Sequence, residues 1–214
     1  MSLTERSFQL RPETFGMTLT LGGRAAGEMS WSVTPDKHFW VARVQTDFGG
    51  VLPDLRRVQV SRVQPRDFTS LGYAEGDGKR ATFETEVDRR AGVLTLRLGR
   101  DEASEPLLND VHDPVSVLLW LRGVGPELEE GGRVGVRMAG GRVYVRRLPD
   151  ADIGGLPARG YELRPGGALA YVEREAPHRL LSLVQPTDFG PIVAELQGER
   201  PTNRAEGGRR RKGR

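Results

Sequence analysis

Apolar and polar residues alternate with a period of two along most of this chain. Clear examples are residues 28–34, 81–88, 94–98 and 142–146. Because successive side chains of a strand point to opposite faces, the pattern predicts strands with one buried and one hydrated face. Short glycine-rich segments separate these runs: Gly22-Gly23, Gly76-Asp77-Gly78, Gly131-Gly132, Gly140-Gly141 and Gly166-Gly167. Connections of this length join antiparallel hairpins.

One segment departs from the alternation and predicts a short helix. Asp113 suits the N-cap, Pro114 the first helical position and Gly123 a left-handed stop. Between these signals only Ser116 and Arg122 are strongly polar. A helix that is apolar on every face must be enclosed by other elements.

Together the two patterns predict a mainly β fold, in which a curved antiparallel sheet or open barrel wraps one short buried helix at about 113–122. Residues 1–198 are expected to form a single β-rich domain, because all-β domains often reach this length as one unit. Residues 199–214 lack aromatic and branched apolar side chains, which predicts a disordered basic tail.

Charge and composition narrow the choice of function. The net charge of +3 is uneven: residues 199–214 carry +5, so the rest of the chain is close to −2. The chain has no cysteine, which excludes disulfides, thiol catalysis and cysteine-ligated metals. No apolar run is long enough for a membrane span and no leader is visible. As the sequence stands a cytoplasmic location is expected, or the periplasm or envelope if a leader was removed.

A short internal repeat links two distant parts of the chain. Residues 62–68 resemble residues 183–189, and both copies end in Pro-x-Asp-Phe. One interpretation is a strand-end turn used twice, in which the phenylalanine returns to the core. The other is a pseudo-symmetric relation between two halves of the sheet.

The order of these features resembles a bacterial family called domain of unknown function 3108. The resemblance rests on the glycine-flanked strand pair at 21–31, the Pro-x-x-Phe type turn at 64–68 and the charged strand at 79–88. Its most recognisable element is the helix motif from Asp113 to Arg122, and it spans roughly residues 17–197. The family is uncharacterised, so the resemblance implies no catalytic residues. Many members carry export leaders that this chain lacks. The predicted shape, a curved sheet that holds a helix, is similar to the lipoprotein-carrier folds of bacterial envelopes, by analogy alone.

Two candidate reactive sites lie at and within the predicted helix. Asp110, His112 and Asp113 have a metal-ligand composition, but they also suit the start of a helix, with Asp113 as cap. Ser116 lies within the helix and lacks the Gly-x-Ser-x-Gly context of a hydrolase nucleophile. We therefore expect no metal site and no catalytic serine here.

The carboxylates of Glu84, Glu86 and Asp88 share one face of a strand, as a glycosidase pair would. Their strict alternation next to basic residues favours a hydrated face instead. No glycine-rich segment has the lysine and following helix of a phosphate loop. The sequence therefore predicts no cofactor and favours a protein that is not an enzyme.

Large apolar side chains exceed what one thin layer needs. They form either an ordinary core between the sheet and the helix or an incompletely filled cradle for an apolar or lipid-like ligand. The expected lining residues are Trp31, Trp40, Leu118 and Trp120. Phe48 and Leu52, beside the glycines of residues 49–50, are the expected rim loop. The main hypothesis is thus a non-catalytic binding module.

The alternative is a cytoplasmic nucleic-acid-associated protein. Its basic tail would hold phosphates of nucleic acid, or an anionic membrane, weakly. The residues expected to do so are Arg209, Arg210, Arg211 and Lys212. No aromatic residue lies near them to stack on bases. The sequence does not indicate an oligomeric state.

Overall fold

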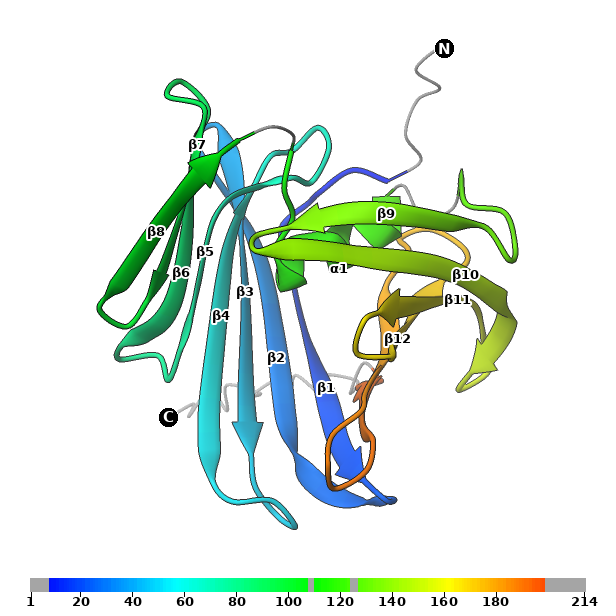
Figure 1. Ribbon diagram of the computed structural model, residues 1–214. Helices are drawn as coiled ribbons and strands as arrows, with labels where there is room; N and C mark the ends of the chain where they lie inside the picture. The colour runs from blue at the N-terminus through cyan, green and yellow to red at the C-terminus, as the bar shows by residue number, and fades with distance from the viewer. Residues whose placement is uncertain (1–7, 108–109, 124–126, 199–214) are drawn as a thin grey trace, which may run out of the picture.

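The chain folds into one long antiparallel sheet that curls around a single helix (Figure 1). The computed structural model describes residues 8–107, 110–123 and 127–198. The strands of the first arm are β1 (Glu13–Leu21), β2 (Arg24–Asp36), β3 (Phe39–Phe48), β4 (Leu55–Val63), β5 (Ser70–Gly76), β6 (Ala81–Asp88), β7 (Val93–Leu98) and β8 (Asp101–Pro106). After the helix α1 (Pro114–Gly123) come β9 (Arg133–Met138), β10 (Gly141–Ile153), β11 (Leu156–Arg164), β12 (Ala168–Glu173), β13 (Leu180–Gln185) and β14 (Ile192–Leu196). The predicted fold class is confirmed.

The two arms meet in the middle of the sheet. The strand order is β8-β7-β6-β5-β4-β3-β2-β1-β14-β13-β12-β11-β10-β9. Every ladder therefore joins strands that are consecutive in the chain, except the ladder between β1 and β14, and the consecutive strands β8 and β9 form the two edges. That pair is antiparallel and brings Met17 opposite Leu196. In Figure 1 the long strands β1–β4 and the β9–β10 hairpin lie on different sides of α1.

The curled sheet does not close into a barrel, because the edge strands β8 and β9 share no ladder among the described residues. Two smaller contacts are made at the β9 edge, one with β8 and one with the segment before the helix. Arg137 on β9 forms an ion pair with Glu105 on β8, with a nitrogen–oxygen distance of 3.1 Å. His112, just before α1, forms an isolated parallel bridge with Met138. The segment leading into the helix therefore occupies part of the open seam.

Asp113 begins the helix as predicted. Its carboxylate accepts hydrogen bonds from the backbone N–H groups of Val115 and Ser116, both at 2.8 Å. The Ser116 hydroxyl accepts in return from the backbone N–H of Asp113, also at 2.8 Å. This reciprocal arrangement satisfies the first free N–H groups of the helix, as a capping box does. Ser61 on β4 donates to the same carboxylate at 2.6 Å, which fixes the helix start to the sheet.

The predicted role of Gly123 as a left-handed stop is wrong. Gly123 has no positive φ and is the last residue of α1. Its importance is steric, because a Cβ at this position would lie 2.4 Å from the Cε2 atom of Phe68. The glycine therefore allows the helix end to pack directly against the aromatic ring.

Arg122 anchors the same end of the helix. The side chain is only 2% exposed, and both terminal nitrogens bond the carboxylate of Glu13 on β1, Nη2 at 3.0 Å. Its Nε atom donates to the backbone carbonyl of His178 at 2.8 Å. The guanidinium also lies over the ring of Phe8, 4.7 Å from the centroid. One buried cation thus joins the helix to the N-terminal segment, β1 and the β12–β13 connection.

The two repeat copies have different environments. Phe68 is buried against the helix end, as the strand-turn interpretation predicts. Phe189 is 82% exposed, so the expectation that it returns to the core is wrong. Its turn closes on itself instead: the Thr187 hydroxyl donates to the carbonyl of Gly190 at 2.6 Å. A turn stabilised by its own bonds needs no buried anchor.

Candidate functional site

A cavity of about 410 Å³ lies between the two arms, against the N-terminal half of α1. The helix and its start contribute Pro114, Val115, Val117 and Leu118. The first arm contributes Met29, Trp31, Val44, Arg57 and Gln59. The second arm contributes Met138, Val143, Leu163, Pro165, Gly166, Ala168, Leu169, Leu183, Val184, Gln185 and Pro186. The volume falls within the range of small-molecule sites, and the walls are mostly apolar, as in such sites.

Strand register places the aromatic wall of the cavity. Trp31 on β2 lies directly opposite Val44 on β3, and both side chains point to the inner face. The Trp31 ring stacks on Phe15, with centroids 5.7 Å apart and planes 8° apart. Its indole N–H lies 3.1 Å from the sulfur of Met29. These contacts hold Trp31 in one orientation beside the empty space.

One wall of the cavity is polar. On β4, Arg57 forms two hydrogen bonds of 2.9 Å with the carboxylate of Glu75 on β5. Gln59 donates its amide to the Tyr73 hydroxyl at 2.6 Å and to Glu75 at 3.4 Å. Tyr73 donates in turn to Glu75 at 2.5 Å. Arg57 and Gln59 line the cavity, while Tyr73 and Glu75 hold them from behind.

The protonation of this network follows from its contacts. Burial alone would raise the pKa of Glu75, but the hydrogen bonds from Arg57 and Tyr73 lower it below its usual range. Burial and the bond to Glu75 raise the pKa of Tyr73. At neutral pH Glu75 is therefore ionised, Arg57 is its counter-ion, and Tyr73 keeps its proton.

The predicted lining residues divide into two pairs. Trp31 and Leu118 line the cavity. Trp40 lies half-buried against the core, opposite Val63 of β4, and is not among the lining residues. Trp120 is also outside the lining and contacts the His112 ring edge-on at 6.1 Å.

The expected rim loop lies beside the first strands. Phe48 and Leu52 are half-buried against the core and do not line the cavity. The loop is hydrogen bonded to β2: the N–H of Val51 donates to the carbonyl of Ala25 at 3.0 Å. A Cβ on Gly50, which has φ of +66°, would lie 2.3 Å from that carbonyl oxygen, so only glycine fits there.

The candidate residues for metal binding or acid–base chemistry do not converge. Asp110 pairs with Arg89 at 2.8 Å on the surface, while Asp113 caps the helix. Burial lowers the pKa of His112 to about 4, and its Nδ1 lies 3.4 Å from the Ser116 hydroxyl. Within residues 8–107, 110–123 and 127–198 no group of three or more acidic or histidine side chains is placed to hold a metal ion.

The carboxylate row of β6 is hydrated. Glu84, Glu86 and Asp88 are all exposed. Glu86 meets Arg97 of β7 at 3.3 Å on the same outer face. The row is therefore a hydrated surface, as the alternation predicts, with one ion pair at Glu86.

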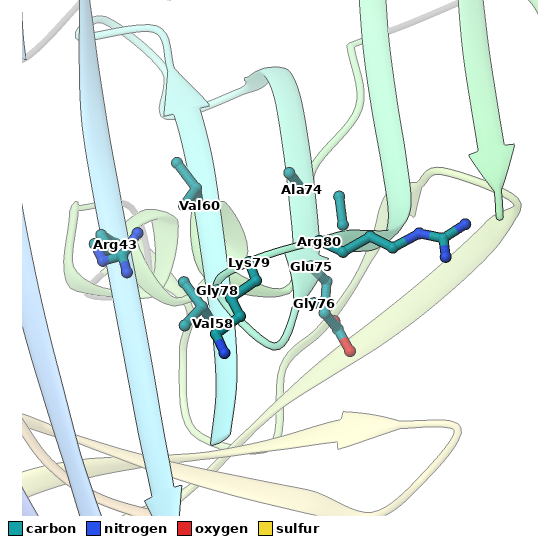
Figure 2. Close-up of a pocket in the computed structure, with 10 residues that line it drawn as sticks. Arg43, Val58, Val60, Ala74, Glu75, Gly76, Gly78, Lys79 and Arg80 are labelled. Carbon is teal, nitrogen blue, oxygen red and sulfur yellow. The ribbon is translucent and has the colours of Figure 1, made fainter. Parts of the chain in front are cut away.

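A second hollow, of about 150 Å³, lies on the opposite face of β4 (Figure 2). Its basic residues are Arg43, Lys79 and Arg80. Figure 2 shows Arg43 and Arg80 on different sides of the hollow, and the Arg80 side chain extends away from Arg43. Because these cations do not converge, the larger inner cavity is the better candidate site.

The basic residues expected to contact phosphates, Arg209, Arg210, Arg211 and Lys212, lie outside the described residues. Of the described residues, none belongs to a helix that is both long enough and apolar enough to cross a membrane.

A curled antiparallel sheet that encloses a helix and an apolar cavity defines a β-barrel-like protein. The chain is similar to the solved β-barrel-like protein of domain of unknown function DUF1849 from Brucella abortus. The TM-score is 0.56 at 10% identity, and the match covers 88% of this chain and 97% of that one. No family model matches the chain, so the resemblance to domain of unknown function 3108 is not confirmed. No curated protein matches it either.

Proposed function

We propose that this protein is a non-catalytic binding module that holds a ligand with an apolar body in the cavity beside α1. The observation that carries the proposal is the cavity itself, because a well-packed protein interior leaves few voids larger than a water molecule. Here about 410 Å³ remains open between two arms and a helix that could have packed together. On the basis of the helix motif from Asp113 to Arg122, we also propose that the chain is related to domain of unknown function 3108.

The lining supports an apolar ligand. Trp31, Val44, Val117, Leu118 and Leu183 present aromatic and aliphatic surface from both arms and the helix. Removing apolar ligand surface from water is worth about 25 cal/mol per Å², so a chain of eight to ten carbons gains several kcal/mol there. The cavity is partly open to solvent and not sealed, so a ligand can reach it.

Native mass spectrometry of the gently purified protein, followed by organic extraction, tests whether a ligand co-purifies. A stoichiometric apolar molecule is the expected result. A parallel test uses the neutral fluorescent probe N-phenyl-1-naphthylamine, which becomes bright in apolar sites. We expect saturable binding of one probe per chain.

A cavity-filling variant locates the site. Leu118→Trp replaces an aliphatic side chain at a half-buried helix position with a larger indole ring that fills part of the cavity. We expect probe affinity to fall at least tenfold. The matched control is Leu98→Trp, at a side chain that is 63% exposed and outside the lining. Equal probe affinity in the Leu118→Trp variant and the unmodified protein would contradict the proposal.

A further inference from the structure

The polar wall of the cavity contains one donor group and one acceptor atom that the protein itself does not use. Arg57 bonds Glu75 through Nε and Nη2, and Nη1 makes no hydrogen bond to any described residue. The Gln59 amide nitrogen faces Tyr73 and Glu75. Since an ionised carboxylate only accepts hydrogen bonds, this orientation of the amide is set by Glu75. The Oε1 atom of Gln59 is left without a partner in the part of the chain that the structure describes.

The same wall carries no net charge. Arg57 is the one charged side chain among the described lining residues, and Glu75 neutralises it in a two-point ion pair. A carboxylate ligand would lose its hydration and then meet a guanidinium whose charge is already balanced. It would also lie near the carboxylate of Glu75, which repels it. The wall therefore favours a polar group without a charge.

We propose that the ligand is amphipathic and that its apolar chain ends in an uncharged group that both accepts and donates hydrogen bonds, such as a hydroxyl. The group accepts from Nη1 of Arg57 and donates to Oε1 of Gln59, while the chain lies along Trp31 and Leu118. This inference rests on the proposed function, since it names the class of ligand for the same cavity.

Three ligands with the same ten-carbon chain test the inference by displacement of N-phenyl-1-naphthylamine from the full-length protein at pH 8. The ligands are 1-decanol, which donates and accepts, its methyl ether, which only accepts, and decanoate, which is charged. We expect 1-decanol to bind about fivefold to tenfold more tightly than either of the others, the factor that one net hydrogen bond is worth.

Gln59→Met removes the acceptor and keeps the size of the side chain. The preference for 1-decanol over its methyl ether should then fall to within about twofold, in line with the loss of one hydrogen bond. The matched control is Gln45→Met, the same substitution at a half-buried side chain of β3 that bonds Asp47 and does not line the cavity. It should leave the preference unchanged. Saturable probe binding by both variants shows that each has folded.

Two results would overturn the inference while leaving the cavity proposal intact. One is tighter binding of decanoate than of 1-decanol, which would assign a charged head group to Arg57. The other is an unchanged preference for 1-decanol in the Gln59→Met variant. If none of the three ligands displaces the probe, the proposed function itself fails and the inference fails with it.

Discussion

Replacing Arg122 with methionine is expected to destabilise the protein by about 3–4 kcal/mol, because breaking a buried ion pair typically costs about 3–5 kcal/mol. Arg122 is 2% exposed, so its pairing with Glu13 and its bond to the His178 carbonyl are made away from water. Methionine fills similar space but leaves both acceptors without their donor. The Glu13 side chain is 18% exposed and recovers some hydration, which places the cost in the lower part of that range.

Urea unfolding followed by circular dichroism measures this cost, provided that the slope of free energy against urea is unchanged. The matched control is Arg56→Met, because Arg56 pairs with Asp47 at 2.6 Å while the side chains are 57% and 46% exposed. That exposed pair should be worth less than about 1 kcal/mol. Adding Glu13→Gln to Arg122→Met removes the abandoned charge and should restore about 1 kcal/mol or more. If Arg122→Met costs no more than Arg56→Met, the reasoning about burial is refuted.

Two further predictions concern the ends of the helix. Gly123→Ala should destabilise the protein by about 1–2 kcal/mol in the same assay, since overpacking against Phe68 outweighs the gain in helix propensity. The control is Gly141→Ala, where a Cβ would meet nothing within 4 Å and stability should change by less than about 0.5 kcal/mol. Equal effects of the two substitutions would contradict the steric role of Gly123. Burial lowers the pKa of His112 to about 4, so the unfolded chain binds this proton more tightly than the folded one. Stability should therefore fall as pH drops from about 6.5 to about 4, by about 3 kcal/mol more than in His112→Gln, and parallel pH profiles of the two proteins would rule this out.

The strands and the helix could be predicted because their signals are local. Alternation and glycine turns mark each hairpin, and the Asp113 cap with an apolar run marks α1. The pairing of β1 with β14 leaves no such signal, because Met17 and Leu196 are far apart in the sequence. The sequence predicts the end of the helix at Gly123 for the wrong reason, a left-handed stop. The actual reason is close packing against the ring of Phe68, which is distant in the sequence and gives no local signal.

The cavity was only partly predictable, because alternation does not say which face of a strand is the inner one. In β4 the apolar residues Val58 and Val60 suggest the inner face, but they line the outer hollow. There Val58 is covered by the β5–β6 turn, in which Gly78 approaches it closely. The inner positions hold Arg57 and Gln59 instead. Two polar residues that alternate with Val58 and Val60 were the available signal, and they identify the wall only once the covering turn is known.

The junction of β1 with β14 has a consequence for synthesis of the protein on the ribosome. At about 5–20 residues per second, on the order of ten to thirty-five seconds pass between translation of the first strand and of the last. Throughout that interval β1 has β2 on one side and an unsatisfied row of backbone groups on the other, the kind of edge that pairs with other chains. The nascent protein therefore depends on β14 to cover this edge, and truncation before Ile192 leaves it permanently open.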